Sequence, residues 1–178
     1  MFQQICRALS GTDNRVLMFF HKACRCDLLD ASLSHLTELG STIFLFVVAS
    51  AMLPFKKRKA RQYGILLLAG ITLARFSSRL FKELFMRARP YVSLGGATAM
   101  VGAGGYSFPS GHATAAFMGA YILSKCFGRS LVFFSLAVLV AFSRVYLGVH
   151  YPTDVLAGAA LGTFIGYLVV RLSGMEER

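Results

Sequence analysis

Long apolar stretches separated by short polar segments are the main pattern along the chain. Each stretch is close to the roughly 20 residues that a helix needs to cross the hydrocarbon core of a bilayer. The pattern therefore predicts an all-α fold, a polytopic membrane helix bundle with about five transmembrane helices. We expect these helices at about residues 30–53, 62–85, 110–126, 130–149 and 152–172.

The first 28 residues have a different pattern, because charged residues interrupt their apolar positions. Within them, "NRVLMFFHKA" is typical of a short amphipathic helix that lies in the membrane interface. The segment lacks the continuous apolar core and the small-residue cleavage site of a signal peptide. We therefore predict a single domain over residues 1–178, with an interfacial segment at 1–28 and a transmembrane bundle at 30–172.

Composition supports a membrane protein and argues against nucleic acid as a partner. Hydrophobic residues make up 56% of the chain and charged residues 15%, whereas a typical soluble domain has about 25% charged residues. The net charge is +11, but its densest block, "KKRKAR", lies between two apolar stretches. Such a basic loop is usually a cytoplasmic signal. With five spans, the loops before residue 110 and near residue 150 then lie on the extracytoplasmic side of a cell membrane.

Two smaller patterns concern packing and thiols. Gly158, Gly162 and Gly166 follow one another at four-residue spacing, which permits close approach of a second helix. The partner is either a helix of the same bundle, which we favour, or a second copy of the chain. The four cysteines form no CxxC pair and no zinc-ligand pattern with the histidines, so we interpret them as free thiols.

A first polar cluster, "KELFMRARP", stands at the end of the second predicted helix and holds Lys82, Arg87 and Arg89. Lys82 and Arg89 are seven residues apart, about two helical turns, and so lie on roughly one face. Taken alone, they fit better with basic side chains that extend from a helix end to the interface.

A second cluster, "FPSGH", reads as the start of the third helix. Ser110 is expected to be the N-cap, Gly111 leaves the backbone open, and His112 lies in the first turn. The free amide groups of a helix N-terminus also form an anion site.

The third cluster, "SRVYLGVHYPTD", places Arg144, His150 and Asp154 between two apolar helices. Pro152 suits the first position of the last helix, which puts Asp154 in its first turn. A carboxylate there can accept a hydrogen bond from one imidazole nitrogen and leave the other directed as a nucleophile or base.

All three clusters are predicted to meet at one membrane surface. Together they supply cations, a helix N-terminus, two histidines and a carboxylate, which match an anion with several oxygens such as a phosphate. Of the two histidines, only His150 has a carboxylate partner. This difference suggests that one histidine acts as the nucleophile and the other as the acid.

In order and spacing, the clusters resemble the three signature motifs of the type 2 phosphatidic acid phosphatase (PAP2) superfamily. The resemblance covers residues 82–154 directly, and the helical pattern extends it to the C-terminus. Membrane members of this family commonly have six spans, whereas we expect five here. The matching positions are Lys82-x6-Arg89-Pro90, Pro109-Ser110-Gly111-His112 and Ser143-Arg144-x5-His150-x3-Asp154.

The resemblance implies a phosphatase that forms a covalent phosphohistidine and needs no metal ion or other cofactor. His150 would attack phosphorus, Asp154 would hold and polarise it, and His112 would protonate the leaving oxygen. The absence of an acidic cluster fits a site without a divalent metal. The groups that would bind the phosphoryl oxygens are Lys82, Arg89, Ser110, the Gly111 amide and Arg144.

A site at the interface with apolar walls suits a phosphate on a lipid anchor, so the expected partners are a lipid phosphate and the bilayer. Undecaprenyl diphosphate is the substrate that we favour. Phosphatidylglycerol phosphate, phosphatidic acid and lipid A phosphate are alternatives. A membrane transporter or a lipid-binding scaffold would explain the apolar helices, but not the pairing of His150 with Asp154 beside three cations. The oligomeric state is left open.

Overall fold

The computed structural model describes residues 2–23, 25–94 and 97–175, with side chains described except at 2–10 and 22–23. All regular secondary structure in these residues is helical, which confirms the all-α class. The elements are α1 (Phe2–Ala23), α2 (Asp27–Leu36), the 3₁₀ helix η1 (Thr37–Gly40), α3 (Thr42–Met52), α4 (Arg58–Phe85), α5 (Pro90–Ser93), α6 (Gly111–Phe127), α7 (Ser130–Tyr146) and α8 (Pro152–Leu172).

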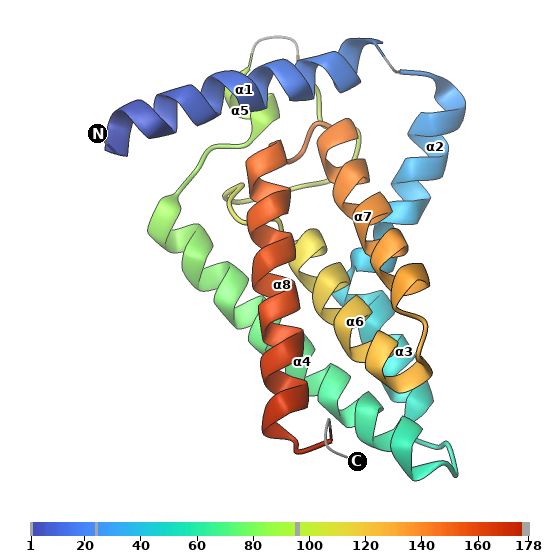
Figure 1. The fold of residues 1–178 in the computed structure, drawn as a ribbon. Coiled ribbons are helices and arrows are strands. Elements are labelled where there is room, and N and C mark those ends of the chain that lie inside the picture. The colour runs from blue at the N-terminus through green and yellow to red at the C-terminus, as the bar shows by residue number, and fades with distance from the viewer. Residues whose placement is uncertain (1, 24, 95–96, 176–178) are drawn as a thin grey trace.

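Helices α3, α4, α6, α7 and α8 form a bundle, and α1 lies across one end of it (Figure 1). Helix α6 contacts α3, α4, α7 and α8, so it is the central element. Small residues such as Ala113, Ala116 and Ala120 are buried along α6 and allow its neighbours to approach closely.

The glycines of α8 pack within the chain. A Cβ atom on Gly162 would stand 2.1 Å from the Thr114 carbonyl oxygen of α6, and one on Gly158 would stand 2.7 Å from the Ser110 carbonyl oxygen. Both distances are shorter than any normal carbon–oxygen contact. Of the two interpretations of the glycine pattern, the structure supports packing between α8 and α6.

Four of the predicted helices agree with the structure to within a few residues, and α8 begins and ends where we expected. The helix predicted at 30–53 is wrong as one straight element, because α2 and α3 are bent by 52°. Ser41 starts α3 as its N-cap and accepts a hydrogen bond from the Phe44 amide (3.1 Å). A Cβ on Gly40 would stand 2.6 Å from Val140 Cγ1, so the chain bends where it passes close to α7.

By length and composition, two helical segments of the described residues could cross a membrane, Arg58–Ser93 and Pro152–Leu172. The bent pair of α2 and α3 is a third candidate if it counts as one span, and α7 is a shorter apolar helix. Five spanning helices therefore remain a prediction.

Helix α1 is longer than the amphipathic helix that we expected, and one of its faces is buried. Asp13, Leu17 and His21 follow at four-residue spacing, and none is more than 3% exposed. The Thr98 amide donates to His21 Nε2 (3.2 Å), which ties α1 to the loop before α6. The location of α1 in a membrane interface stays a prediction.

Candidate active site

The three polar clusters meet at the end of the bundle that α1 crosses. The first cluster spans the last turn of α4 and the segment after it, the second starts α6, and the third forms the junction of α7 and α8 (Figure 1). The backbone joins the last two directly, because the Ser110 amide donates to the Asp154 carbonyl oxygen (3.0 Å). Residues far apart in the sequence therefore share one site, as the motifs predicted.

The junction of α7 and α8 fixes the histidine and its carboxylate. Pro152 begins α8, and Asp154 in the first turn accepts a hydrogen bond from the Tyr151 amide (2.9 Å). His150 Nδ1 lies 3.5 Å from Asp154 Oδ2, with both residues buried. This distance is longer than a hydrogen bond, as is common at active sites without substrate. The imidazole thus presents Nδ1 to the carboxylate and Nε2 to the opposite side.

Burial lowers the pKa of His150 to about 3, because an imidazolium loses its hydration there. The Asp154 carboxylate opposes this effect, whereas the charges of Arg89 and Arg144 add to it. The ring is therefore neutral at pH 7. With its proton on Nδ1, it keeps a lone pair on Nε2.

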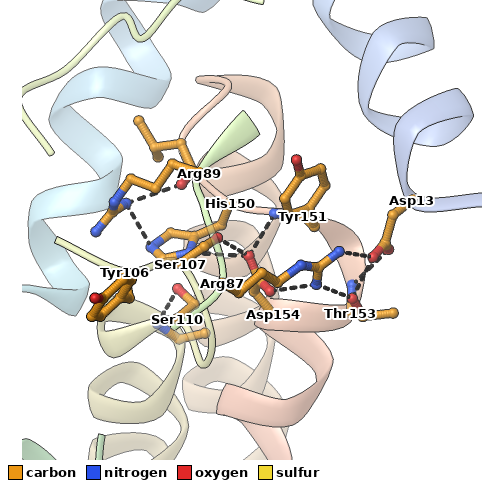
Figure 2. A network of polar contacts seen from close by, with 12 residues as sticks. Asp13, Arg87, Arg89, Tyr106, Ser107, Ser110, His150, Tyr151, Thr153 and Asp154 are labelled. Atoms are coloured by element: carbon orange, nitrogen blue, oxygen red, sulfur yellow. Dashed lines mark hydrogen bonds and ion pairs between the residues drawn. The ribbon is translucent and has the colours of Figure 1, made fainter. Parts of the chain in front are cut away.

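Arg89 holds its guanidinium group against this lone pair. It donates hydrogen bonds to the carbonyl oxygens of Gly105 (3.0 Å), Gly104 (2.8 Å) and Val149 (3.0 Å). One of its terminal nitrogens lies 3.3 Å from His150 Nε2 (Figure 2). The loop carbonyls thus fix a buried positive charge next to His150 Nε2, where an anion would be stabilised.

Lys82 and Arg144, the other two cations predicted for the site, lie around the same group of residues as Arg89. Lys82 Nζ donates to the Tyr106 carbonyl oxygen (2.5 Å). Arg144 donates from one terminal nitrogen to Thr37 Oγ1 (3.0 Å), and its Nε has no hydrogen-bond partner although it is buried. A buried donor without an acceptor costs free energy that a bound anion would recover.

The start of α6 has the predicted N-cap. Ser110 Oγ accepts a long hydrogen bond from the Ala113 amide (3.4 Å). A Cβ on Gly111 would meet no atom within 4 Å, so the backbone is open there. Gly111, His112 and Lys82 line a cavity of about 450 Å³ between η1, α3, α4 and α6.

The sequence prediction missed a second partner of the carboxylate. Arg87 forms ion pairs with Asp154 Oδ1 (2.7 Å) and with Asp13 Oδ2 of α1 (2.6 Å) (Figure 2). Asp13 also accepts a hydrogen bond from the Thr153 amide (3.0 Å), and the Ser107 hydroxyl donates to Asp154 Oδ2. The position of Arg87 in the first basic cluster was a signal, but nothing in the sequence connects Asp13 with this site.

Two further predictions concern metal ligands and thiols. Among the described residues, no group of three or more histidine, cysteine, aspartate or glutamate side chains is placed to hold a metal ion. Cys26 and Cys126 are free thiols. The thiols of Cys6 and Cys24 lie outside the described side chains.

A helical bundle with apolar exposed faces and a buried histidine among cations fits a membrane phosphatase. The sequence pattern of the PAP2 superfamily matches residues 62–178. The chain belongs to this superfamily, whose members include lipid phosphatases, and it is a phosphatase.

Similar proteins of known sequence or structure support this assignment. Phosphatidylglycerophosphatase B of Bacillus subtilis is 31% identical over 166 residues, covering 84% of this chain and 76% of the relative. Undecaprenyl-diphosphatase of Sulfolobus acidocaldarius is 31% identical over 147 residues, covering 81% and 70%. The crystal structure of a transmembrane PAP2-type phosphatidylglycerolphosphate phosphatase from Bacillus subtilis superposes with a TM-score of 0.78 at 29% identity, covering 96% of this chain and 87% of that one.

Proposed function

We propose that the chain hydrolyses undecaprenyl diphosphate in the cell membrane, at the extracytoplasmic surface, through a covalent phosphohistidine. The observation that carries the proposal is the orientation of His150, with Nδ1 toward Asp154 and Nε2 toward the Arg89 guanidinium. A neutral imidazole with this orientation is an activated nucleophile beside a fixed positive charge.

In the first step, His150 Nε2 attacks the terminal phosphorus. The nitrogen–phosphorus bond forms as the bond to the leaving oxygen breaks, and His112 gives its proton to that oxygen. Asp154 holds the Nδ1 proton and balances the positive charge that develops on the ring. In the second step, water attacks the phosphohistidine, His112 accepts the proton, and phosphate leaves.

The phosphoryl oxygens carry most of the negative charge in both steps. Fixed cations and amide groups around them stabilise the transition state without having to reorganise. The groups that we assign to this task are Lys82, Arg89, Ser110, the Gly111 amide and Arg144.

The apolar helices around the site favour a phosphate on a lipid, and a relative that matches over 70% of its length is named an undecaprenyl-diphosphatase. The test is phosphate release by the purified protein in detergent, from undecaprenyl diphosphate, phosphatidylglycerol phosphate, phosphatidic acid and lipid A phosphate. We expect the highest kcat/KM on the first. A higher value on another lipid would reassign the substrate, and release from none would refute the lipid phosphatase proposal.

A separate prediction follows from the proposed metal-independent mechanism. Phosphate release should persist in excess chelator, because the proposed steps use only side chains and water. Vanadate, which adopts the five-coordinate geometry of the transferring phosphoryl group, should inhibit. Activity that chelator abolishes and magnesium restores would contradict the metal-free mechanism.

A further inference from the structure

The cavity beside His112 extends beyond the residues of the proposed site. Lys82, Gly111 and His112 border one part of it. The part that continues along α4 is lined by Arg75, Ser78 and Arg79, to which no step of the proposed reaction assigns a role. We call these three residues the α4 subsite.

The α4 subsite is polar within a helix that is long and apolar enough to span a membrane. Arg75, Arg79 and Lys82 are spaced by four and three residues, so their side chains lie along one face of α4. Charged residues at such positions in membrane helices are costly, and they usually mark a pathway or a ligand site.

The donors of the α4 subsite are poorly satisfied. Arg75 donates one hydrogen bond, to Thr42 Oγ1 (3.2 Å). Within the part of the chain that the structure describes, the exposed side chain of Arg79 forms no hydrogen bond or ion pair. Ser78 Oγ is buried and has no hydrogen-bond partner. An anion with several oxygens would satisfy all three side chains.

The proposed role of His112 indicates which part of a substrate would occupy the cavity. His112 protonates the leaving oxygen, so the leaving group lies on the side that His112 faces. An alcohol leaving group carries no charge for two arginines to bind. A lipid diphosphate differs, because its leaving group is a lipid monophosphate.

We propose that Arg75, Ser78 and Arg79 form a subsite for a second phosphate group, the one that stays on the leaving group of a lipid diphosphate. The proposal rests on the proposed function. His150 takes the terminal phosphoryl group, the bond between the bridging oxygen and the terminal phosphorus breaks, and that oxygen receives the proton from His112. The α4 subsite then holds the charge that the lipid monophosphate keeps.

The test compares two substrates that share a chain and differ by one phosphate, farnesyl diphosphate and farnesyl monophosphate. Initial rates of purified protein in detergent give kcat/KM for each. We expect the double variant Arg75→Gln, Arg79→Gln to lose about 10–100-fold on the diphosphate, as is typical for hydrogen bonds to charged groups. Its kcat/KM on the monophosphate should stay within about twofold, which also shows that the variant is folded.

The matched control is Arg129→Gln, an exposed arginine in the loop between α6 and α7, which should leave both substrates unaffected. Ser78→Ala should lower only the diphosphate value. Phosphatidylglycerol phosphate provides a third arm, since its second phosphate is a diester further along the head group. A loss confined to this lipid would overturn the assignment to diphosphates.

Equal losses on both farnesyl substrates, or no loss on either, would overturn the subsite and leave the phosphatase proposal intact. Hydrolysis of the monophosphate but not the diphosphate by the wild-type protein would also overturn the subsite proposal. Wild-type protein that releases phosphate from none of the three lipids would refute the proposed function, and the subsite with it.

Discussion

At the scale of single residues, the two histidines differ in surroundings as well as in sequence. His150 is buried between a carboxylate and a guanidinium group, whereas His112 borders a cavity. A nucleophile must form a bond for every substrate, but an acid matters in proportion to the basicity of the leaving group. Proton transfer of this kind typically contributes about 10²–10⁴-fold.

The roles of the two histidines can therefore be distinguished by comparing substrates whose leaving groups differ in basicity. His112→Ala should reduce turnover of an alkyl phosphate far more than turnover of nitrophenyl phosphate, because nitrophenolate leaves without a proton. His150→Ala should reduce both to background and leave no covalent phosphoprotein in a rapid alkaline quench, in which a phosphohistidine is stable. Equal losses in both variants on both substrates would contradict the assignment, and the reverse pattern would exchange the roles.

A second prediction at this scale concerns the pair formed by Asp13 and Arg87. Asp13→Asn removes the charge that balances Arg87, which then binds Asp154 more strongly and draws it from His150. We expect kcat to fall by up to about 100-fold with little change in KM, since misplacement of a catalytic group by about 1 Å has such an effect.

The control for this prediction is Asp27→Asn, an exposed acidic residue at the start of α2. Asp13→Glu should restore part of the rate, because it keeps the charge. A loss of thermal stability without any change in kcat would give Asp13 a purely structural role.

At the scale of elements, the site depends on how closely α8 packs against α6. The first turn of α8 carries Asp154 and the start of α6 carries Ser110 and His112, so a shift between these helices would separate the proposed catalytic groups. Gly162 lies at the tightest contact that we describe between them, where a Cβ would stand 2.1 Å from an oxygen.

Gly162→Ala should therefore destabilise the bundle, by about 1–3 kcal/mol or more as overpacked cores usually do. The measurement is the Tm of the purified protein in detergent, together with kcat on a lipid phosphate. Ala160→Leu adds more volume on an exposed part of the same helix and should leave both values unchanged. A Gly162→Ala protein with the wild-type Tm would mean that the helices pack less tightly than in this structure.

At the scale of the whole molecule, the site and the basic loop lie at opposite ends of the bundle. The basic block "KKRKAR" covers the end of the loop between α3 and α4 and the first turn of α4, and the proposed catalytic residues meet near α1 (Figure 1). The positive-inside rule then predicts an extracytoplasmic site. Gly102 suits a labelling test, because it is exposed and an added Cβ would meet no atom within 4 Å.

In a background without native cysteines, Gly102→Cys should react with an impermeant thiol reagent in intact cells. Lys57→Cys, in the basic loop, should react only after the cells are opened. The opposite pattern would reverse the orientation and place the site in the cytoplasm.

Local sequence patterns were sufficient for several features of this protein. Pro152, Asp154 and the apolar run after them specify a capped helix, and α8 has the predicted bounds. Ser110 caps α6 for the same local reason. The motif residues were also predictable as a set, because their order and spacing resemble a known family whose pattern matches the chain.

Only the tertiary structure decided the remaining features, because they depend on contacts between segments far apart in the sequence. The close approach of Gly40 to Val140 accompanies the bend between α2 and α3, and Asp13 reaches Arg87 only because α1 crosses the bundle. Likewise, Arg75 and Arg79 look like ordinary basic residues of an apolar helix in the sequence, and only the fold shows that they line the same cavity as His112. The sequence determines which chemical groups the chain carries. The partners of these groups depend on how the helices pack, and local sequence patterns do not encode that packing.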